Sequence, residues 1–336
     1  MLESAICCKA VKTELQSNIN YGGYSMLTKF IDTVTSQKLN IDSIIVTKGN
    51  EKFEHFFTND NEGSIRSISK TVSCLGAGKA IEKKLYSLDT EILPFFDLNK
   101  ITNTKNIPYL KKMKIRHLLN LTIGQDKGLM FSKDIKQLPA DTDFLYYILN
   151  YDINHDPGTH FVYNNAATYL LCAITQKITG KYFRDWVQEE IFNEMDVTLG
   201  EWEKTWQGIC LGASGLKLKN RDMHKIALLL LNKGIYEGKQ LISKNWISMM
   251  STPQFFTADL PDYVKKQGRC INKMSYGFGL WICGNGTFEY PKTHYFCDGT
   301  DGQFLIVAPD AQMAITILSH QKDMNPIYDA IQYFFN

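Results

Sequence analysis

A serine and a lysine whose spacing suits nucleophilic catalysis lie in the segment SIRSISKTVSCLGAGK, which spans residues 64–79. In a helix, Ser67 and Lys70 would lie on nearly the same face, one turn apart. Residues 71–78 carry no charge, so this helix would be small or apolar on every side, as buried helices are. Burial disfavours the charged form of lysine and lowers its pKa. The segment therefore predicts a Ser67 nucleophile whose proton passes to Lys70 directly or through a relay.

The same Ser-x-x-Lys spacing occurs at two other places, so the spacing alone is weak support for a site. Ser214/Lys217 lies in GASGLKLK, where Gly215 favours a turn. Ser319/Lys322 follows a predicted strand and leads into the polar sequence HQKD, where the lysine would be solvated. The first pair differs from both because an uncharged helix follows it.

Hydrophobic periodicity predicts helices and one hairpin in the first two thirds of the chain. Residues 25–37 have apolar side chains at helical spacing, and residues 42–57 form a predicted hairpin with its turn at Lys48-Gly49-Asn50. The region from about 86 to 235 is mostly helical in pattern. The sequence predicts the ends of two of these helices. The helix at residues 166–180 closes at Gly180, and the helix at residues 220–234 has an Asn or Asp cap and a closing glycine.

The last third of the chain has the pattern of an antiparallel meander. Short apolar runs are separated by Gly-Asn-Gly and Pro-Asp turn signals, and an amphipathic helix runs through Ile327, Ile331 and Phe334. If strands from both chain ends share one sheet, the helical middle is an insertion beside it, with a ligand cleft between the two parts. The expected fold class is α/β (α+β) with two lobes. Their predicted limits are about 20–85 with 240–336 for the α/β lobe, and about 86–239 for the helical lobe.

Two segments resemble those of serine β-lactamases of the class C type and of the related penicillin-binding proteins, D-stereospecific peptidases and carboxylesterases. The Ser67 segment is similar to their nucleophile motif. The segment PGTHFVYNNAATYLLCAITQKITG resembles their Tyr-x-Asn motif, with Tyr163 and Asn165 at the motif positions. Supporting segments follow in the family order at 115–124, 215–234 and 276–282. The resemblance covers nearly the whole chain and implies a β-lactamase/transpeptidase-like fold.

This resemblance also implies a role for each motif residue. Ser67 would attack a carbonyl and form an acyl-enzyme, with Lys70 close to it and favouring the tyrosinate form of Tyr163. Tyr163 would pass protons between the serine, the leaving group and water. Asn165 would bind Lys70 or a substrate amide. A buried tyrosine with a satisfied hydroxyl and a helix-capping asparagine remain the structural alternatives.

The third family motif departs from its usual pattern in this chain. Relatives have Lys or His, then a small residue, then Gly, on a strand that lines the cleft. Here FCDGTDGQF places Cys297-Asp298-Gly299 at those positions. Gly299 lets a substrate approach the strand backbone closely. The resemblance further implies an oxyanion hole formed by the N–H groups of Thr300 and Ser67.

The missing cation bears on the substrate that we expect. In relatives this cation helps to bind the carboxylate of β-lactams and D-Ala-D-Ala peptides, and here Asp298 adds a negative charge instead. His294 lies three residues earlier and would replace the cation only after a shift of register. We therefore expect a serine hydrolase without metal or cofactor, of the esterase, amidase or D-peptidase type. Its substrate would be a neutral or amine-bearing ester, amide or peptide, and the missing cation disfavours β-lactamase activity.

Three other functions are compatible with parts of the sequence. A penicillin-binding or sensor-type protein of the same fold would acylate slowly or be inactive, and the Cys297-Asp298 departure is its best support. A thiol enzyme would use Cys297 with His294 and Asp298, but strand alternation places Cys297 and Asp298 on opposite faces. An α/β-hydrolase is disfavoured because no G-x-S-x-G elbow occurs. The sequence has no HExxH motif, P-loop or Cys/His zinc spacing.

The composition of the 336-residue chain narrows its partners and location. A net charge of +2 gives no indication of nucleic acid or an anionic membrane as the main partner. The eight cysteines form no CxxC pair, which favours a reducing compartment. The N-terminus lacks the pattern of a signal peptide, and no apolar run reaches the ~18 residues of a membrane span. We expect a cytoplasmic protein that binds a small molecule; the sequence leaves the oligomeric state open.

Overall fold

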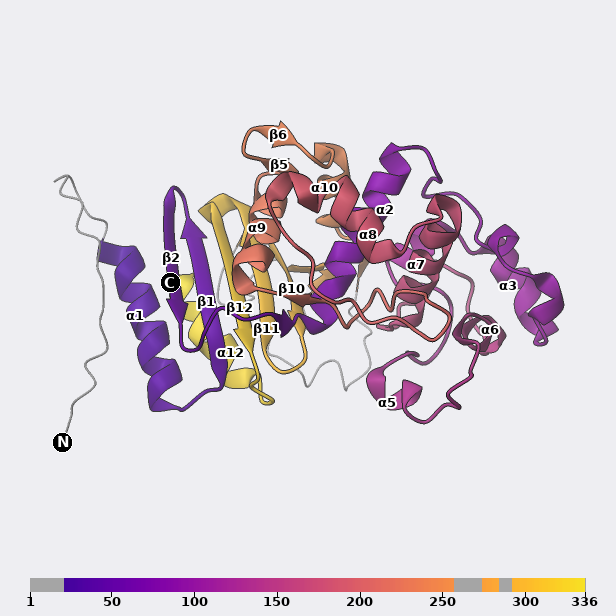
Figure 1. The fold of residues 1–336 in the computed structure, drawn as a ribbon, viewed down its shortest axis with the longest axis horizontal. Coiled ribbons are helices and arrows are strands. Elements are labelled where there is room, and N and C mark those ends of the chain that lie inside the picture. The colour runs from indigo at the N-terminus through magenta and orange to yellow at the C-terminus, as the bar shows by residue number, and fades with distance from the viewer. Residues whose placement is uncertain (1–20, 257–273, 284–291, 336) are drawn as a thin grey trace.

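The computed structural model describes residues 21–256, 274–283 and 292–335 (Figure 1). Its main feature is an eight-stranded antiparallel sheet in the order β2-β1-β12-β11-β10-β9-β8-β7. The strands are β1 (Ile41–Lys48), β2 (Glu51–Phe56), β7 (Phe255–Phe256), β8 (Met274–Tyr276), β9 (Trp281–Cys283), β10 (His294–Gly299), β11 (Gln303–Ala308) and β12 (Met313–Ser319). Because β1 pairs with β12, the predicted sheet from both chain ends is confirmed. Two short pairs lie outside it: β3 (Gly63–Ser64) with β4 (Lys217–Leu218), and β5 (Ile235–Tyr236) with β6 (Lys239–Gln240).

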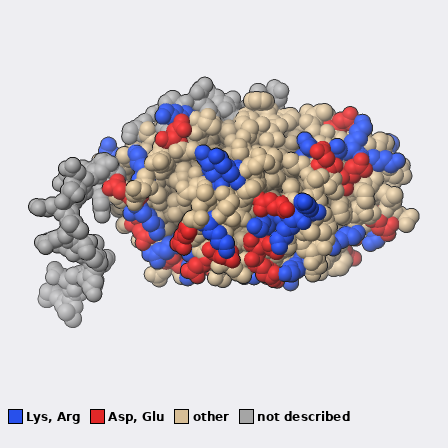
Figure 2. Space-filling model, turned by 90° about the horizontal axis from the view of Figure 1, so that it is seen from above, with Lys and Arg blue, Asp and Glu red and all other residues tan. Residues whose placement is uncertain are grey.

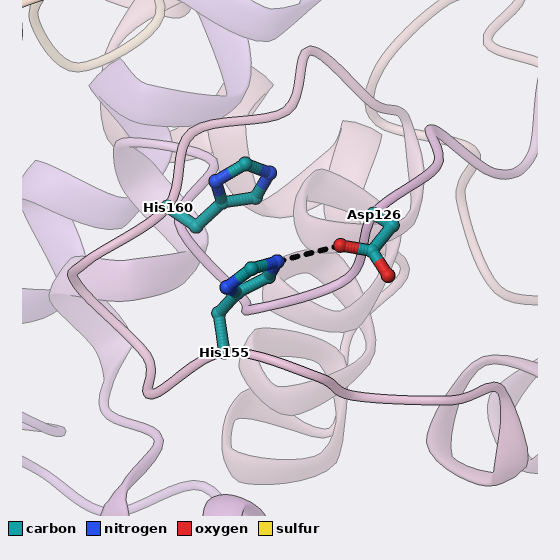
Figure 3. A group of neighbouring side chains, drawn as sticks. All are labelled: Asp126, His155 and His160. Carbon is teal, nitrogen blue, oxygen red and sulfur yellow. Dashed lines mark hydrogen bonds and ion pairs between the residues drawn. The ribbon is translucent and has the colours of Figure 1, made fainter.

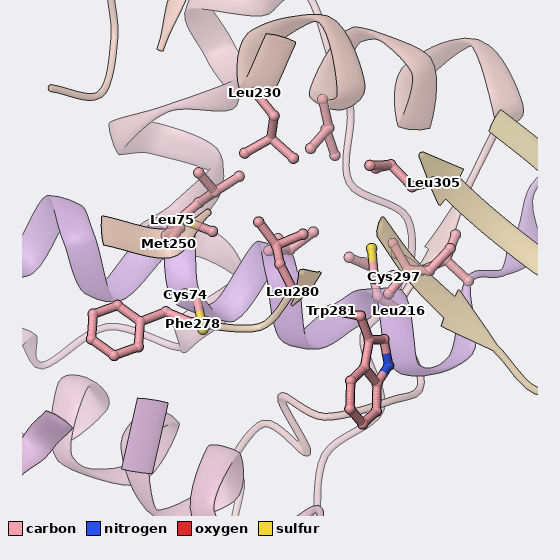
Figure 4. Close-up of a cluster of buried hydrophobic side chains, with 14 of the residues drawn as sticks. Cys74, Leu75, Leu216, Leu230, Met250, Phe278, Leu280, Trp281, Cys297 and Leu305 are labelled. Atoms are coloured by element: carbon pink, nitrogen blue, oxygen red, sulfur yellow. The ribbon is translucent and has the colours of Figure 1, made fainter. Parts of the chain in front are cut away.

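Helices cover both faces of this sheet, as the burial of its central strands requires. Every residue of β11 and β12 is buried. On one face, Phe304 packs against Tyr328 of α12 (Asn325–Ile331), and α12 packs against α1 (Tyr21–Ser36). The next residue, Leu305, points to the opposite face and joins a cluster with Leu230 of α9 (Asn220–Leu231) (Figure 4). Alternation along the strand thus gives three layers, helix on sheet on helix.

The remaining helices lie mostly in the middle of the chain, where the sequence predicts them. They are α2 (Ser69–Glu82), α3 (Ile107–Lys112), α4 (Ile115–Leu119), α5 (Ser132–Ile135), α6 (Phe144–Asn150), α7 (Ala166–Thr179), α8 (Phe183–Glu190) and α10 (Lys244–Met250). Short 3-10 turns connect them: η1 (Arg66–Ile68), η2 (Leu93–Phe95), η3 (Leu98–Lys100), η4 (Thr104–Asn106) and η5 (Phe192–Met195). Later in the chain come η7 (Pro309–Ala311) and η8 (Gln332–Phe334). The helix α2 lies at the centre of the molecule and packs against α7 and α8 (Figure 1).

The ends of α7 and α9 test the predicted capping signals. Gly180 closes α7 in the left-handed conformation, at φ +67°, as predicted. The expected Asn or Asp cap of α9 is wrong, because Lys219 occupies the N-cap position. Asn220 instead donates its side-chain amide to Ser43 Oγ and to the Thr316 carbonyl, which ties the start of α9 to the sheet. Tertiary hydrogen bonds have replaced the local cap.

The two-lobe division remains our proposal. One helix is notable in this respect: α9 packs against β1, β11 and β12 although it lies within the range 86–239 of the proposed helical lobe. None of the helices in the described ranges combines the length and hydrophobicity that a bilayer span requires. On the face shown in Figure 2, basic and acidic side chains are intermixed over the surface.

Five cysteines of the described residues are buried and form no disulfide, at positions 74, 172, 210, 283 and 297. Three others, Cys7, Cys8 and Cys270, lie outside the described residues, as do the N-terminal segment and the predicted Gly-Asn-Gly turn at 284–286.

Candidate active site

Ser67 lies in the 3-10 turn η1, directly before α2, and not within the helix itself as predicted. The turn is held on both sides: Arg66 donates Nη2 to Asp301 Oδ2 at 2.8 Å, and Ser69 Oγ donates to the Arg66 carbonyl at 2.6 Å. Arg66 has a left-handed backbone, with φ at +52°, a conformation that costs energy for a residue with a side chain. This tight turn places Ser67 at the entrance to α2 while Lys70 follows within the first helical turn.

Lys70 is buried, with 2% of its surface exposed, as the uncharged helix predicts. Every residue of α2 from Ser69 to Gly78 is buried with it. The Lys70 ammonium donates to Ser67 Oγ at 3.2 Å, to Asn165 Oδ1 at 2.7 Å and to the Ala213 carbonyl at 3.1 Å. Three oxygen acceptors therefore surround the nitrogen, so the buried group keeps its hydrogen bonds.

Burial lowers the pKa of Lys70 from an ordinary value of 10.5 to about 7, and the nearby Asp298 carboxylate opposes this by raising it. The ring of Tyr163 also favours the charged form, since Lys70 Nζ lies 4.7 Å from its centre. Near neutral pH both the amine and the ammonium are thus accessible. A lysine in this state can accept a proton from Ser67 and return it.

Tyr163 forms one side of the site. Its ring stacks on Trp281, with 5.5 Å between ring centres, and meets Tyr276 edge-on. Lys70 and Tyr163 therefore lie close together, as predicted, with the Lys70 nitrogen over the face of the Tyr163 ring.

Asn165 binds Lys70 but does not cap a helix with its side chain. Its Oδ1 accepts from Lys70, and its Nδ2 donates to the Met130 carbonyl at 2.9 Å. It occupies the N-cap position of α7 without a side-chain cap bond, and Asn164 Oδ1 accepts from the Ala167 N–H instead. The structure is therefore consistent with an Asn165 that positions Lys70 and not with one whose side chain caps α7.

The departing motif on β10 separates into two faces. Asp298 lines the cavity beside Ser67 and accepts a hydrogen bond from the Tyr328 hydroxyl at 3.0 Å. Burial raises the pKa of Asp298, while Tyr328 and Lys70 act against that shift. Cys297 points the other way, into an apolar cluster with Leu216 and Leu305 (Figure 4), where burial raises the pKa of its thiol to about 12. Cys297 is not among the residues that line the cavity, so its substrate-binding role remains only a prediction.

His294 does not join Cys297 or the cavity. It is buried on the opposite face of β10 from Cys297, its Nδ1 lies 3.0 Å from the Lys292 carbonyl, and its ring packs against Phe335. The structure therefore assembles neither the thiol site nor the replacement cation.

Gly299 brings β10 against the turn that holds Ser67. A Cβ at this position would lie 2.6 Å from Arg66 Cβ and 2.8 Å from the Ile65 carbonyl oxygen, closer than real contacts allow. Glycine is thus required for the strand to reach the turn. Thr300 follows at the strand end, where it is exposed and lines the cavity.

The cavity has a volume of about 740 Å³. Its walls include aromatic side chains and charges of both signs that the motifs did not identify: Phe131, Lys133, Glu203, Trp281, Phe296, Lys322, Asp323 and Tyr328. Lys322 belongs to the third Ser-x-x-Lys pair and is exposed, as predicted, yet it reaches this rim. These residues come from distant segments of the chain, so no single short motif contains all of them.

Comparison with known proteins agrees with this geometry. The sequence matches the Beta-lactamase family model over residues 64–333. Similar solved structures include the octameric penicillin-binding protein homologue from Pyrococcus abyssi, with 18% identity, a TM-score of 0.71, and coverage of 94% of this chain and 76% of that one. The penicillin binding protein from Bacillus halodurans has 18% identity, a TM-score of 0.68, and coverage of 91% and 100%. EstCE1, a hydrolase with promiscuous acyltransferase activity, has 14% identity, a TM-score of 0.74, and coverage of 93% and 100%. The predicted family and its β-lactamase/transpeptidase-like fold are confirmed.

Proposed function

The chain belongs to the Beta-lactamase family, a family of serine hydrolases, and on this premise we propose that it hydrolyses an ester or amide through an acyl-enzyme on Ser67. One observation carries the proposal. The buried Lys70 nitrogen lies 3.2 Å from Ser67 Oγ, and burial lowers its pKa to about 7. An amine in this setting can activate a serine hydroxyl at neutral pH.

The proposed reaction uses the groups around Ser67 in sequence. Neutral Lys70 accepts the hydroxyl proton as Ser67 Oγ bonds to the substrate carbonyl carbon. The N–H groups of Ser67 and Thr300 stabilise the resulting oxyanion. The proton then passes through the Tyr163 hydroxyl to the leaving alcohol or amine, whose bond to the carbonyl carbon breaks. Water attacks the acyl-enzyme by the same route and releases the acid.

Asp298 supports a substrate that is neutral or bears an amine. Its carboxyl group lines the cavity, and it follows Cys297, which stands at the motif position that is cationic in relatives of the family. A second carboxylate placed there would meet a like charge, whereas an ammonium group would be attracted. We therefore propose an esterase, amidase or D-peptidase that discriminates against carboxylate-bearing β-lactams. From its cysteine spacing, which favours a reducing compartment, we further propose a cytoplasmic location.

The experiment combines covalent labelling with turnover in the full-length protein. A fluorophosphonate probe should label Ser67, located by mass spectrometry of the peptide, and p-nitrophenyl acetate should be hydrolysed. Ser67→Ala should abolish labelling and lower kcat by about 10³-fold or more, and Lys70→Ala should cost nearly as much. The control is Lys217→Ala, another Ser-x-x-Lys lysine, whose ammonium pairs with Glu201 at the surface. This variant should retain wild-type activity.

The possible outcomes separate the two leading functions. Label on Ser67 without turnover of any ester or amide would identify a sensor-type protein. Absence of label, or full turnover in Ser67→Ala, would contradict the Ser67 assignment. A panel of neutral esters, D-amino-acid amides and a chromogenic cephalosporin then tests substrate class, with the cephalosporin expected to be the poorest substrate.

A further inference from the structure

Three side chains capable of binding a metal meet outside the Ser67 cavity: Asp126, His155 and His160 (Figure 3). One ligand atom from each lies within 4.8 Å of the other two. None of the three lines the cavity beside Ser67. These residues have no recognisable metal-binding spacing, because Asp126 is 29 residues from His155 and a turn separates the two histidines.

Backbone contacts hold these residues together independently of any ligand. The N–H groups of Asn154 and His155 both donate to the Gly124 carbonyl, at 2.9 and 3.1 Å. Gly124 has φ at +83°, and a Cβ there would lie 2.2 Å from the His155 carbonyl oxygen. Glycine is thus needed for the two loops to run this close, which places Asp126 across from His155.

A second turn returns the chain so that His160 lies over His155. Thr159 donates both its N–H and its hydroxyl to the Asp156 carbonyl, at 3.1 and 2.7 Å. The two imidazole rings stack with 4.0 Å between centres and an angle of 23°. Both rings therefore face the same carboxylate from one side.

The carboxylate is already oriented by other contacts. Asp126 Oδ1 lies 2.6 Å from His155 Nε2, and Asp126 Oδ2 accepts from the Asn154 side-chain amide. Figure 3 marks the His155–Asp126 contact, and no bond joins His160 to either of the other two. A simple His–Asp pair would account for two of the three residues. Such a pair does not require the His160 imidazole, which stacks on His155.

We propose that Asp126, His155 and His160 bind a divalent transition-metal ion of the zinc type. Two neutral imidazoles and one carboxylate are ligands that suit Zn²⁺, and three protein ligands leave a position for water. The Asn154 amide would act as the outer hydrogen bond that orients a ligating carboxylate. This proposal departs from the metal-free protein that the sequence suggests, and it is independent of the proposed hydrolase function.

The ion would join the two loops that carry part of the catalytic machinery. His160 lies three residues before Tyr163, and the Asp126 loop continues to Met130, whose carbonyl accepts from Asn165. Metal bound at the three residues would connect these loops at the surface. Its expected effect is on stability, because no proposed catalytic atom belongs to the cluster.

The test measures zinc binding to the full-length protein after treatment with a chelator and desalting. Isothermal titration with Zn²⁺ should give one ion per chain at this site. Asp126→Asn, His155→Gln and His160→Gln should each weaken that binding by about tenfold or more. Zn²⁺ should raise the Tm of the wild type and not that of these variants, since a ligand that binds the folded state stabilises it. The matched control is His320→Gln, which removes a surface histidine that pairs with Asp42 at 3.3 Å and that has no third candidate ligand among the described residues.

Two results would overturn the proposal. One is failure of the wild type to bind Zn²⁺, and the other is unchanged binding in all three variants. Co²⁺ gives a second measurement that also identifies cysteine ligation: bound at this site, it should show visible d–d bands without a thiolate charge-transfer band. A thiolate band that persists in the His160→Gln variant would place the ion at cysteines. The unfolding curves also confirm that each variant is folded.

Discussion

At the residue scale, the environment of Lys70 explains why an ammonium group occupies a buried helix. Removing a lysine from water disfavours its charge, and the surrounding acceptors, Ser67 Oγ, Asn165 Oδ1 and the Ala213 carbonyl, compensate in part. Burial, opposed by the nearby Asp298 carboxylate, lowers the pKa of Lys70 to about 7. Such a perturbed group beside a serine hydroxyl that lines a cavity is typical of a catalytic site.

The pH dependence of activity follows from this pKa. Below about 7 Lys70 is protonated and cannot accept the Ser67 proton, so kcat/KM should rise as the pH increases through about 7 and then level off. Because Asp298 raises the pKa of Lys70, Asp298→Asn should move the midpoint of the profile to lower pH. Lys70→Arg keeps the charge but cannot deprotonate, and should be nearly inactive throughout. A Lys70→Arg enzyme with wild-type rates would show that the charge alone suffices.

At the element scale, the contact between β10 and η1 sets the distance between the proposed oxyanion donors. Gly299 is the residue that permits it, because Arg66 and Ile65 occupy the space where a Cβ would lie. The strained backbone of Arg66, at φ +52°, is secured by its ion pair with Asp301 just beyond the strand. A strand end and a turn thus hold each other in place.

Gly299→Ala should therefore separate the strand from the turn. Misplacing one oxyanion donor costs about 10²-fold in kcat, and overpacking costs about 1–3 kcal/mol of stability. Activity assays with urea unfolding measure both effects. Gly63→Ala is the matched control, since its Cβ would make an ordinary 3.5 Å contact with Leu318. Equal activity in the two variants would contradict the role given to Gly299.

At the scale of the whole molecule, the two ends of the chain complete one structure. β1 pairs with β12, and Phe30 of α1 meets Phe334 of η8 with 5.7 Å between ring centres. Both phenylalanines are buried, on the side of the sheet that α9 does not cover. The contacts that join these two parts of the chain are therefore long-range in the sequence.

Phe30→Ala should lower the free energy of unfolding by about 3–5 kcal/mol, because it leaves a cavity in this layer. The specific activity of the folded fraction should not change, since the residue does not line the Ser67 cavity. A double-mutant cycle with Phe334→Ala, measured by urea unfolding, should show a coupling of at least about 0.5 kcal/mol. Additive effects of the two substitutions would argue against the contact.

Much of the candidate site could be predicted from local sequence. Where the sequence-based predictions failed, the failure has a physical cause. The Ser67–Lys70 spacing and the burial of α2 depend on helical periodicity and on the absence of charge, which are local properties. Local sequence could not predict which of Cys297 and Asp298 borders the cavity. Alternation places them on opposite faces of β10, but which face borders the cavity depends on the packing of the whole sheet.

By itself, the sequence determined the positions of the main helices and strands, the buried lysine one turn after a serine, and the family. Tertiary structure alone decided that Asn220 would bond to Ser43 of β1 and Thr316 of β12 instead of capping α9, and that Asp126 would meet two histidines. The physical reason is range: side-chain periodicity acts over a few residues, whereas these contacts join segments that only the packed sheet and its helices bring together.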